Sequence, residues 1–185
     1  PNLLPLTTYS HNTRPYHSNR HFYNIKHGDT IWNPGGMPSK TELDSYECRH
    51  GMGYSVFTGV KNGLMAQLTD FVPMGSTCEI NKLTLKNTSD KKKDFSVFSY
   101  VEFCLWNAMD DMTNFQRNFS TGEVEIHVGG SQLFHKTEYR ERRNHYAVYA
   151  VNASVDGFDT DRDSFLGAYG ENSARSVVVN DQSKN

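Results

Sequence analysis

The residues best suited to chemistry follow an apolar stretch in the middle of the chain. Residues 106–118 read WNAMDDMTNFQRN and bring Trp, Asn, Asp, Gln and Arg side chains together. This segment is too polar to be core and too aromatic to be an idle loop. Amide, carboxylate and guanidinium groups all form hydrogen bonds with hydroxyl groups. The segment therefore suggests recognition of a sugar or another polyol at a sheet edge.

Such a site needs a rigid support, and residues 95–105 are expected to provide it as a central strand. Their apolar side chains occupy both alternating faces: Phe95, Val97, Val101, Phe103 and Leu105 on one, and Phe98, Tyr100 and Cys104 on the other. A strand of this kind is stable only when both of its faces are covered. Polar groups placed at its end would be held rigidly.

The rest of the chain predicts an all-β fold of the large antiparallel sandwich type. Asn62-Gly63 separates two alternating runs, which is the strongest short signal for a hairpin. No long stretch has the 3.6-residue period of a helix. Residues 1–28 are expected to be irregular or truncated, and residues 29–185 to be part of one sandwich domain. The remaining predicted strands are 54–60, 64–72, 79–87, 122–128, 133–137 and 145–152, with a polar turn at 88–94. Leu83 and Leu85 are expected to point inward, and the strand 145–152 is expected to be apolar on both faces.

The composition of the chain argues against several classes of function. The chain has 185 residues and a net charge of −2, which argues against a general nucleic-acid or membrane-surface binder. No window approaches the roughly 20 apolar residues of a membrane span. The chain has neither an initiator Met nor a closing element after residues 177–179, and we interpret it as a piece of a longer protein.

Neither a metal site nor a disulfide framework is predicted. The cysteines Cys48, Cys78 and Cys104 lie far apart, so they are expected to be reduced thiols. Residues 159–163 resemble the start of a calcium loop, but Ser164 replaces the glycine and Gly170 the glutamate that such a loop needs.

No nucleophile motif or phosphate loop is present, and adjacent Asp110 and Asp111 need not face one substrate across a cleft. Each of two charged segments has two possible structural interpretations. Residues 135–146 are a salt-bridged hairpin tip or a contact surface. Residues 47–51 hold a buried ion pair beside a glycine turn, or form part of a contact.

Several blocks of the sequence resemble the N-terminal domain of the inverting glycoside phosphorylases of glycoside hydrolase family 94, the family of cellobiose phosphorylase. The resemblance covers about residues 29–180 in register, whereas residues 1–27 match poorly. The blocks are YECRHGMGYS at 46–55, KLTLKNTSD at 82–90, and the segments 96–126, 135–152 and 157–169.

The resemblance implies a super-sandwich domain of the galactose mutarotase type in a cytoplasmic, homodimeric, glycosyltransferase-type phosphorylase. Such an enzyme converts cellobiose and phosphate into α-glucose 1-phosphate and glucose without a cofactor. Its general acid and phosphate site belong to an (α/α)₆ barrel that this chain lacks, so no catalytic residue is assigned here. Sibling enzymes act on cellodextrin, laminaribiose or chitobiose. The rival hypothesis is a non-catalytic carbohydrate-binding or scaffold module.

The resemblance also implies which residues of this chain touch substrate. In the family, the loop matching residues 113–118 reaches the active site, and its Gln and Arg line the acceptor-sugar subsite. These positions are Gln116 and Arg117, which would bind a glucose or cello-oligosaccharide acceptor. Phe115, Asn114 and Asn118 are candidates for supporting that site. Neither nucleic acid nor a membrane is an expected partner.

Overall fold

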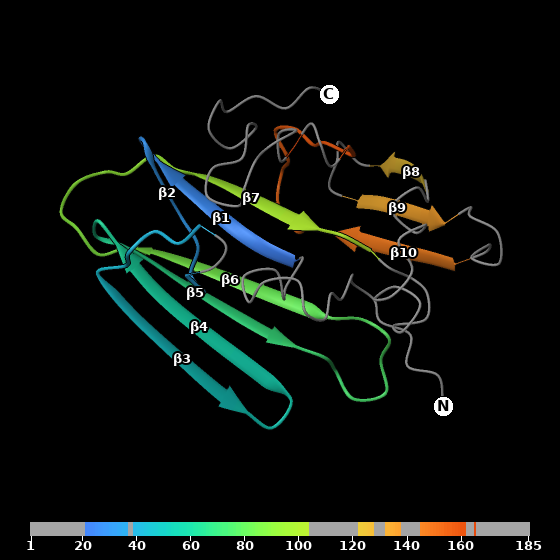
Figure 1. Ribbon diagram of the computed structural model, residues 1–185, viewed down its shortest axis with the longest axis horizontal. Helices are drawn as coiled ribbons and strands as arrows, with labels where there is room; N and C mark the ends of the chain where they lie inside the picture. The colour runs from blue at the N-terminus through green and yellow to red at the C-terminus, as the bar shows by residue number, and fades with distance from the viewer. Residues whose placement is uncertain are drawn as a thin grey trace. The chain divides into compact units, whose positions relative to one another are not determined.

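The computed structural model describes residues 21–36, 39–103, 122–127, 132–137, 145–161 and 165. All ten elements within these residues are strands, arranged in three sheets (Figure 1). The pairs β1–β2, β3–β4, β4–β5, β5–β6, β8–β9 and β9–β10 are antiparallel. The all-β prediction is therefore confirmed. The strands are β1 His21–His27, β2 Thr30–Trp32, β3 Ser45–Gly51, β4 Tyr54–Lys61, β5 Leu64–Phe71, β6 Ile80–Asn87, β7 Ser96–Val101, β8 Gly122–His127, β9 Gln132–Thr137 and β10 His145–Ala150.

The chain divides into two compact units, one built around residues 23–99 and the other around residues 100–168. In the described parts of both, no helix has the length and apolar character needed to cross a membrane.

The first unit contains a four-stranded meander with the order β3-β4-β5-β6 (Figure 1). The predicted hairpin joins β4 to β5, and Lys61 pairs with Leu64 across the turn. Asn62 and Gly63 have φ angles of 49° and 72°, the left-handed conformation that a two-residue hairpin requires. Strands β4, β5 and β6 match the predicted runs to within one residue at each end.

The core of this unit lies between the meander and the β1–β2 hairpin. Ile25 and Trp32, from β1 and β2, form one cluster with Leu64 and Ala66 from β5. Leu43, Leu83 and Leu85 pack against that cluster, which confirms the predicted inward positions of Leu83 and Leu85. Sheets that bury apolar side chains between their faces in this way form a sandwich.

The second unit contains a three-stranded sheet with the order β10-β9-β8. Aromatic stacking joins distant parts of the chain in the same unit. The Tyr100 ring stacks on Phe22 at a centroid distance of 4.9 Å and on Phe165 at 5.1 Å. Ala147 is the buried residue of β10.

The expectation that residues 95–105 form a central strand covered on both faces is wrong for the described part. Strand β7 spans Ser96–Val101 and stands last in the order β2-β1-β7. Phe95 and Val97 are each 41% exposed. An apolar alternation shows that a segment is a strand, but it does not distinguish a covered face from an uncovered one.

Two further expectations need correction. Residues 21–27 form β1, so the irregular segment predicted for residues 1–28 does not include them. The alternation of β1 was missed because the polar Asn24 takes a buried position beside the buried Ile25. In β10, Tyr146 and Val148 are exposed, so one of its two apolar faces is open.

Candidate functional site

The residues predicted to bind the acceptor sugar lie outside the described residues. This applies to Asn114, Phe115, Gln116, Arg117 and Asn118 alike, and their roles remain predictions. Among the described residues, a group of titratable and hydroxyl side chains lies on the meander.

One face of the meander changes from apolar to polar along its strands. Residues that pair across antiparallel strands point to the same side, so each register row defines one strip of that face. The rows are Tyr46, Gly59, Ala66 and Leu85; then Cys48, Phe57, Leu68 and Leu83; then His50, Ser55, Asp70 and Asn81. The face that forms the core near Ala66 therefore carries titratable and hydroxyl groups toward the β3–β4 turn.

Three of these side chains form a connected chain of contacts. The Nε2 atom of His50 lies 3.2 Å from the Sγ atom of Cys48. The Nδ1 atom of His50 lies 2.8 Å from the Oγ atom of Ser55, its cross-strand partner. We refer to Cys48, His50 and Ser55 as the thiol–imidazole cluster. Both ring nitrogens of the histidine are engaged, which fixes the plane of the ring.

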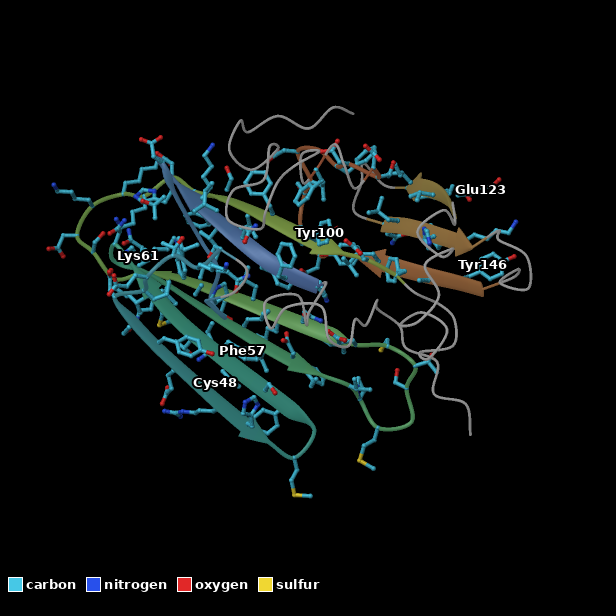
Figure 2. The ribbon with its side chains drawn as sticks, in the orientation of Figure 1. Cys48, Phe57, Lys61, Tyr100, Glu123 and Tyr146 are labelled. Carbon is cyan, nitrogen blue, oxygen red and sulfur yellow. The ribbon has the colours of Figure 1, made fainter. Side chains whose placement is uncertain are left out.

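Two aromatic residues flank this cluster. The Phe57 ring meets the His50 ring edge-on, at a centroid distance of 6.1 Å and an interplanar angle of 84°. Figure 2 labels Phe57 and Cys48 on the neighbouring strands β4 and β3. Burial, and then the adjacent Cys48 side chain, raise the pKa of Tyr46, so its hydroxyl keeps its proton at neutral pH.

An open hollow of about 490 Å³ lies at the end of the meander beside the cluster. Its lining includes the polar residues His50, Ser55, Asp70 and Glu79 and the aromatic residues Tyr54 and Phe71. Hydroxyl, imidazole and carboxylate groups beside aromatic rings can bind polar organic molecules.

The described residues contain no group of three or more His, Cys, Asp or Glu side chains that could hold a metal ion. Residues 162–164 of the segment that resembles a calcium loop lie outside them. His135 behaves as a packed histidine: it stacks on Phe103 at 5.6 Å, and burial lowers its pKa, which favours the neutral ring.

Residues 47–51 contain the expected ion pair, but it is exposed rather than buried. Arg49 donates a hydrogen bond to Glu47 at 2.8 Å, with side chains that are 72% and 55% exposed. Both residues project from the opposite face of β3 to Cys48 and His50, because strand residues alternate. Residues that are neighbours along the chain therefore lie on opposite faces here, so the grouping 47–51 does not show the cluster. The period of two, which places residues 46, 48 and 50 together, could have found it.

An antiparallel sandwich with polar and aromatic groups at a sheet end is an architecture of carbohydrate-active proteins and of many others. The sequence match defines the class. The family model "Glycosyl hydrolase 94, supersandwich domain" matches residues 4–185. The chain belongs to this family, and the match includes most of the N-terminal segment that the blocks described above did not cover.

Proteins similar to this chain include sugar phosphorylases. The chain is 30% identical over 173 residues to the N,N′-diacetylchitobiose phosphorylase of Vibrio furnissii, an alignment that covers 89% of this chain and 21% of that protein. It is 32% identical over 167 residues to the solabiose phosphorylase of Paenibacillus borealis, covering 87% and 21%. The chain thus spans about a fifth of the length of these relatives.

Proposed function

We propose that this chain is the super-sandwich portion of a glycoside phosphorylase that uses phosphate to cleave a disaccharide. The observation that carries the proposal is the family match over residues 4–185, together with relatives that are named as phosphorylases. In this reaction phosphate attacks the anomeric carbon while a carboxylic acid protonates the glycosidic oxygen, and one displacement inverts the centre. Both groups would act from a domain other than this chain.

Cellobiose is the proposed substrate, giving α-glucose 1-phosphate and glucose. Its support is the resemblance of residues 98–125 to the cellobiose enzymes of the family. The relatives are named for different sugars, chitobiose and solabiose among them, so the reaction class has broader support than the disaccharide. Chitobiose, laminaribiose and cellodextrin are the other substrates to assay. We further propose a cytoplasmic homodimer.

The substrate assay uses the full-length protein, phosphate and each disaccharide in turn. Phosphorus NMR identifies the sugar phosphate and its anomeric configuration. Release of α-glucose 1-phosphate from cellobiose supports the full proposal, and release from another disaccharide corrects only the substrate. If the protein binds these sugars but cleaves none of them, it is a carbohydrate-binding or scaffold module. The isolated 185-residue chain should be inactive in the same assay.

Arg117 and Gln116 are proposed to bind the acceptor hydroxyls. Arg117→Ala in the full-length enzyme should raise the acceptor KM in the synthetic direction by about tenfold or more, because hydrogen bonds to charged groups contribute about 1.5–3 kcal/mol. Initial rates at varied glucose and fixed glucose 1-phosphate measure this.

Arg49→Ala is the matched control, since Arg49 is an exposed arginine on the meander and pairs with Glu47. Its acceptor KM should equal that of the unmodified enzyme. An unchanged KM in Arg117→Ala would remove Arg117 from the acceptor subsite while leaving the phosphorylase activity itself in place.

A further inference from the structure

We propose that Cys48 is a reactive thiol that exchanges with small-molecule disulfides, with His50 as its proton carrier and Ser55 as the group that orients His50. The proposal does not depend on the sugar chemistry. It rests on the contacts of His50: 3.2 Å from Nε2 to the Cys48 sulfur, and 2.8 Å from Nδ1 to the Ser55 hydroxyl oxygen.

The same geometry fits the states before and after a proton moves from Cys48 to His50. With a neutral ring, the Cys48 thiol donates to Nε2 and the Nδ1–H group donates to the Ser55 oxygen. With a charged ring, the Nε2–H group donates to the thiolate and the second hydrogen bond is unchanged. Each imidazole nitrogen has a suitable partner in both states. The proton can therefore move between sulfur and nitrogen without a change of rotamer.

The position of the cluster combines support with access. His50 and Ser55 pair across β3 and β4, so the backbone holds them opposite each other. The edge-on ring of Phe57 limits tilting of the imidazole. Cys48 is partly exposed and His50 is exposed, so a reagent in solution can reach the thiol. His50 and Ser55 also border the open hollow.

The exchange step balances without an added oxidant. The Cys48 thiolate attacks one sulfur of the incoming disulfide, a new sulfur–sulfur bond forms, and the original disulfide bond breaks. The departing thiolate takes the proton that His50 had received from Cys48. The products are a mixed disulfide at Cys48 and one free small thiol.

Cys78 supplies an internal control. It is a free and exposed thiol whose sulfur lies 2.9 Å from the hydroxyl oxygen of Ser76. A serine hydroxyl can form a hydrogen bond but does not accept a thiol proton at neutral pH. Cys78 therefore reports the reactivity of an accessible thiol without an imidazole partner.

The experiment treats the full-length protein at pH 7 with the neutral disulfide 4,4′-dithiodipyridine and follows each cysteine by peptide mass spectrometry. The thiolate is the attacking species, and His50 would increase the share of Cys48 present as thiolate. A stabilised thiolate is less nucleophilic, which offsets part of this gain. Cys48 should therefore react at least about threefold faster than Cys78. The same comparison in urea should bring the two rates together.

Three variants separate chemistry from structure. His50→Gln should slow Cys48 toward the rate of Cys78 and leave Cys78 unchanged. Ser55→Ala should have a smaller effect in the same direction, and Cys78→Ser should leave the Cys48 rate unaltered. The proposal is overturned if Cys48 in the unmodified protein reacts no faster than Cys78, or if His50→Gln leaves the Cys48 rate unchanged while urea still equalises the two thiols.

Discussion

At the scale of single residues, Asp44 shows how a carboxylate just before β3 holds the β4–β5 turn. Its Oδ1 atom accepts a hydrogen bond from Lys61 Nζ at 3.1 Å, and its Oδ2 atom accepts one from the Asn62 backbone N–H at 2.6 Å. Its own N–H donates to the Val60 carbonyl at 2.8 Å. The two hydrogen bonds that the carboxylate accepts, from Lys61 and then from Asn62, favour its charged form and lower the pKa of Asp44 below its ordinary value of 3.8.

Lys61→Met should therefore raise the pKa of Asp44 toward 3.8, as measured by carbon NMR titration of the carboxyl group. Because the pKa of the folded state is the lower one, the carboxylate adds stability above pH 3.8 that is lost as pH falls through that lower pKa. Asp44→Asn should make the amide exchange of Asn62 less sensitive to acid. Lys92→Met removes another surface ion pair, with Asp94, and should leave the titration of Asp44 unaltered. An Asp44 pKa that does not move in Lys61→Met contradicts this account.

Residue-level features of the site were only partly predictable. Cys48 was expected to be reduced, and it is a free thiol. The cluster forms only if β3 stays regular through residue 50 and if the register places Ser55 opposite His50. Neither condition can be predicted from the type of a single residue. The acceptor-binding roles of Gln116 and Arg117 came from the family pattern rather than from local physics, and they await the kinetic assay.

At the scale of elements, the β4–β5 turn is the local feature that the sequence specified most directly. Gly63 adopts a φ of 72°, where a residue with a side chain is strained, and a Cβ atom there would lie 3.1 Å from the Cβ atom of Ser89. Gly63→Ala should therefore destabilise the hairpin by about 1–2 kcal/mol. Native-state hydrogen exchange of the β4 and β5 amides measures this loss directly.

Gly63→Asn is the matched comparison, because asparagine adopts the left-handed conformation more readily than alanine. It should cost less than Gly63→Ala, although both introduce the same Cβ contact. Equal losses in the two variants would assign the effect to the Ser89 contact rather than to the backbone angle.

The positions of the strands along the sequence were more predictable than the pairing of one strand with another. Period-two alternation and turn residues are local signals, and they located β4, β5 and β6 to within one residue. Packing determines which strands pair across a long separation in the sequence, and β7 illustrates the difficulty. Its alternation predicts a central position, yet it stands last among the described strands of its sheet. The buried Asn24 hid β1 for the opposite reason, because a polar side chain occupies an inward position.

At the scale of the whole molecule, contacts between neighbouring strands contrast with contacts between residues far apart along the chain. The meander joins β3 to β6 in sequence order. The stack of Phe22, Tyr100 and Phe165 instead needs residues from distant parts of the chain. Local contacts form with less loss of chain entropy than distant ones.

The aromatic stack thus has a consequence for biosynthesis. As the polypeptide leaves the ribosome, the meander can become protease-resistant soon after residue 87 emerges, whereas the partner of Tyr100 at residue 165 has yet to be made. Nascent chains stalled past residue 130 should protect the meander from brief proteolysis, and a Phe165→Ala change should not alter that protection. Protection that begins only in chains long enough to expose residue 165 would instead show that the two units mature together during translation.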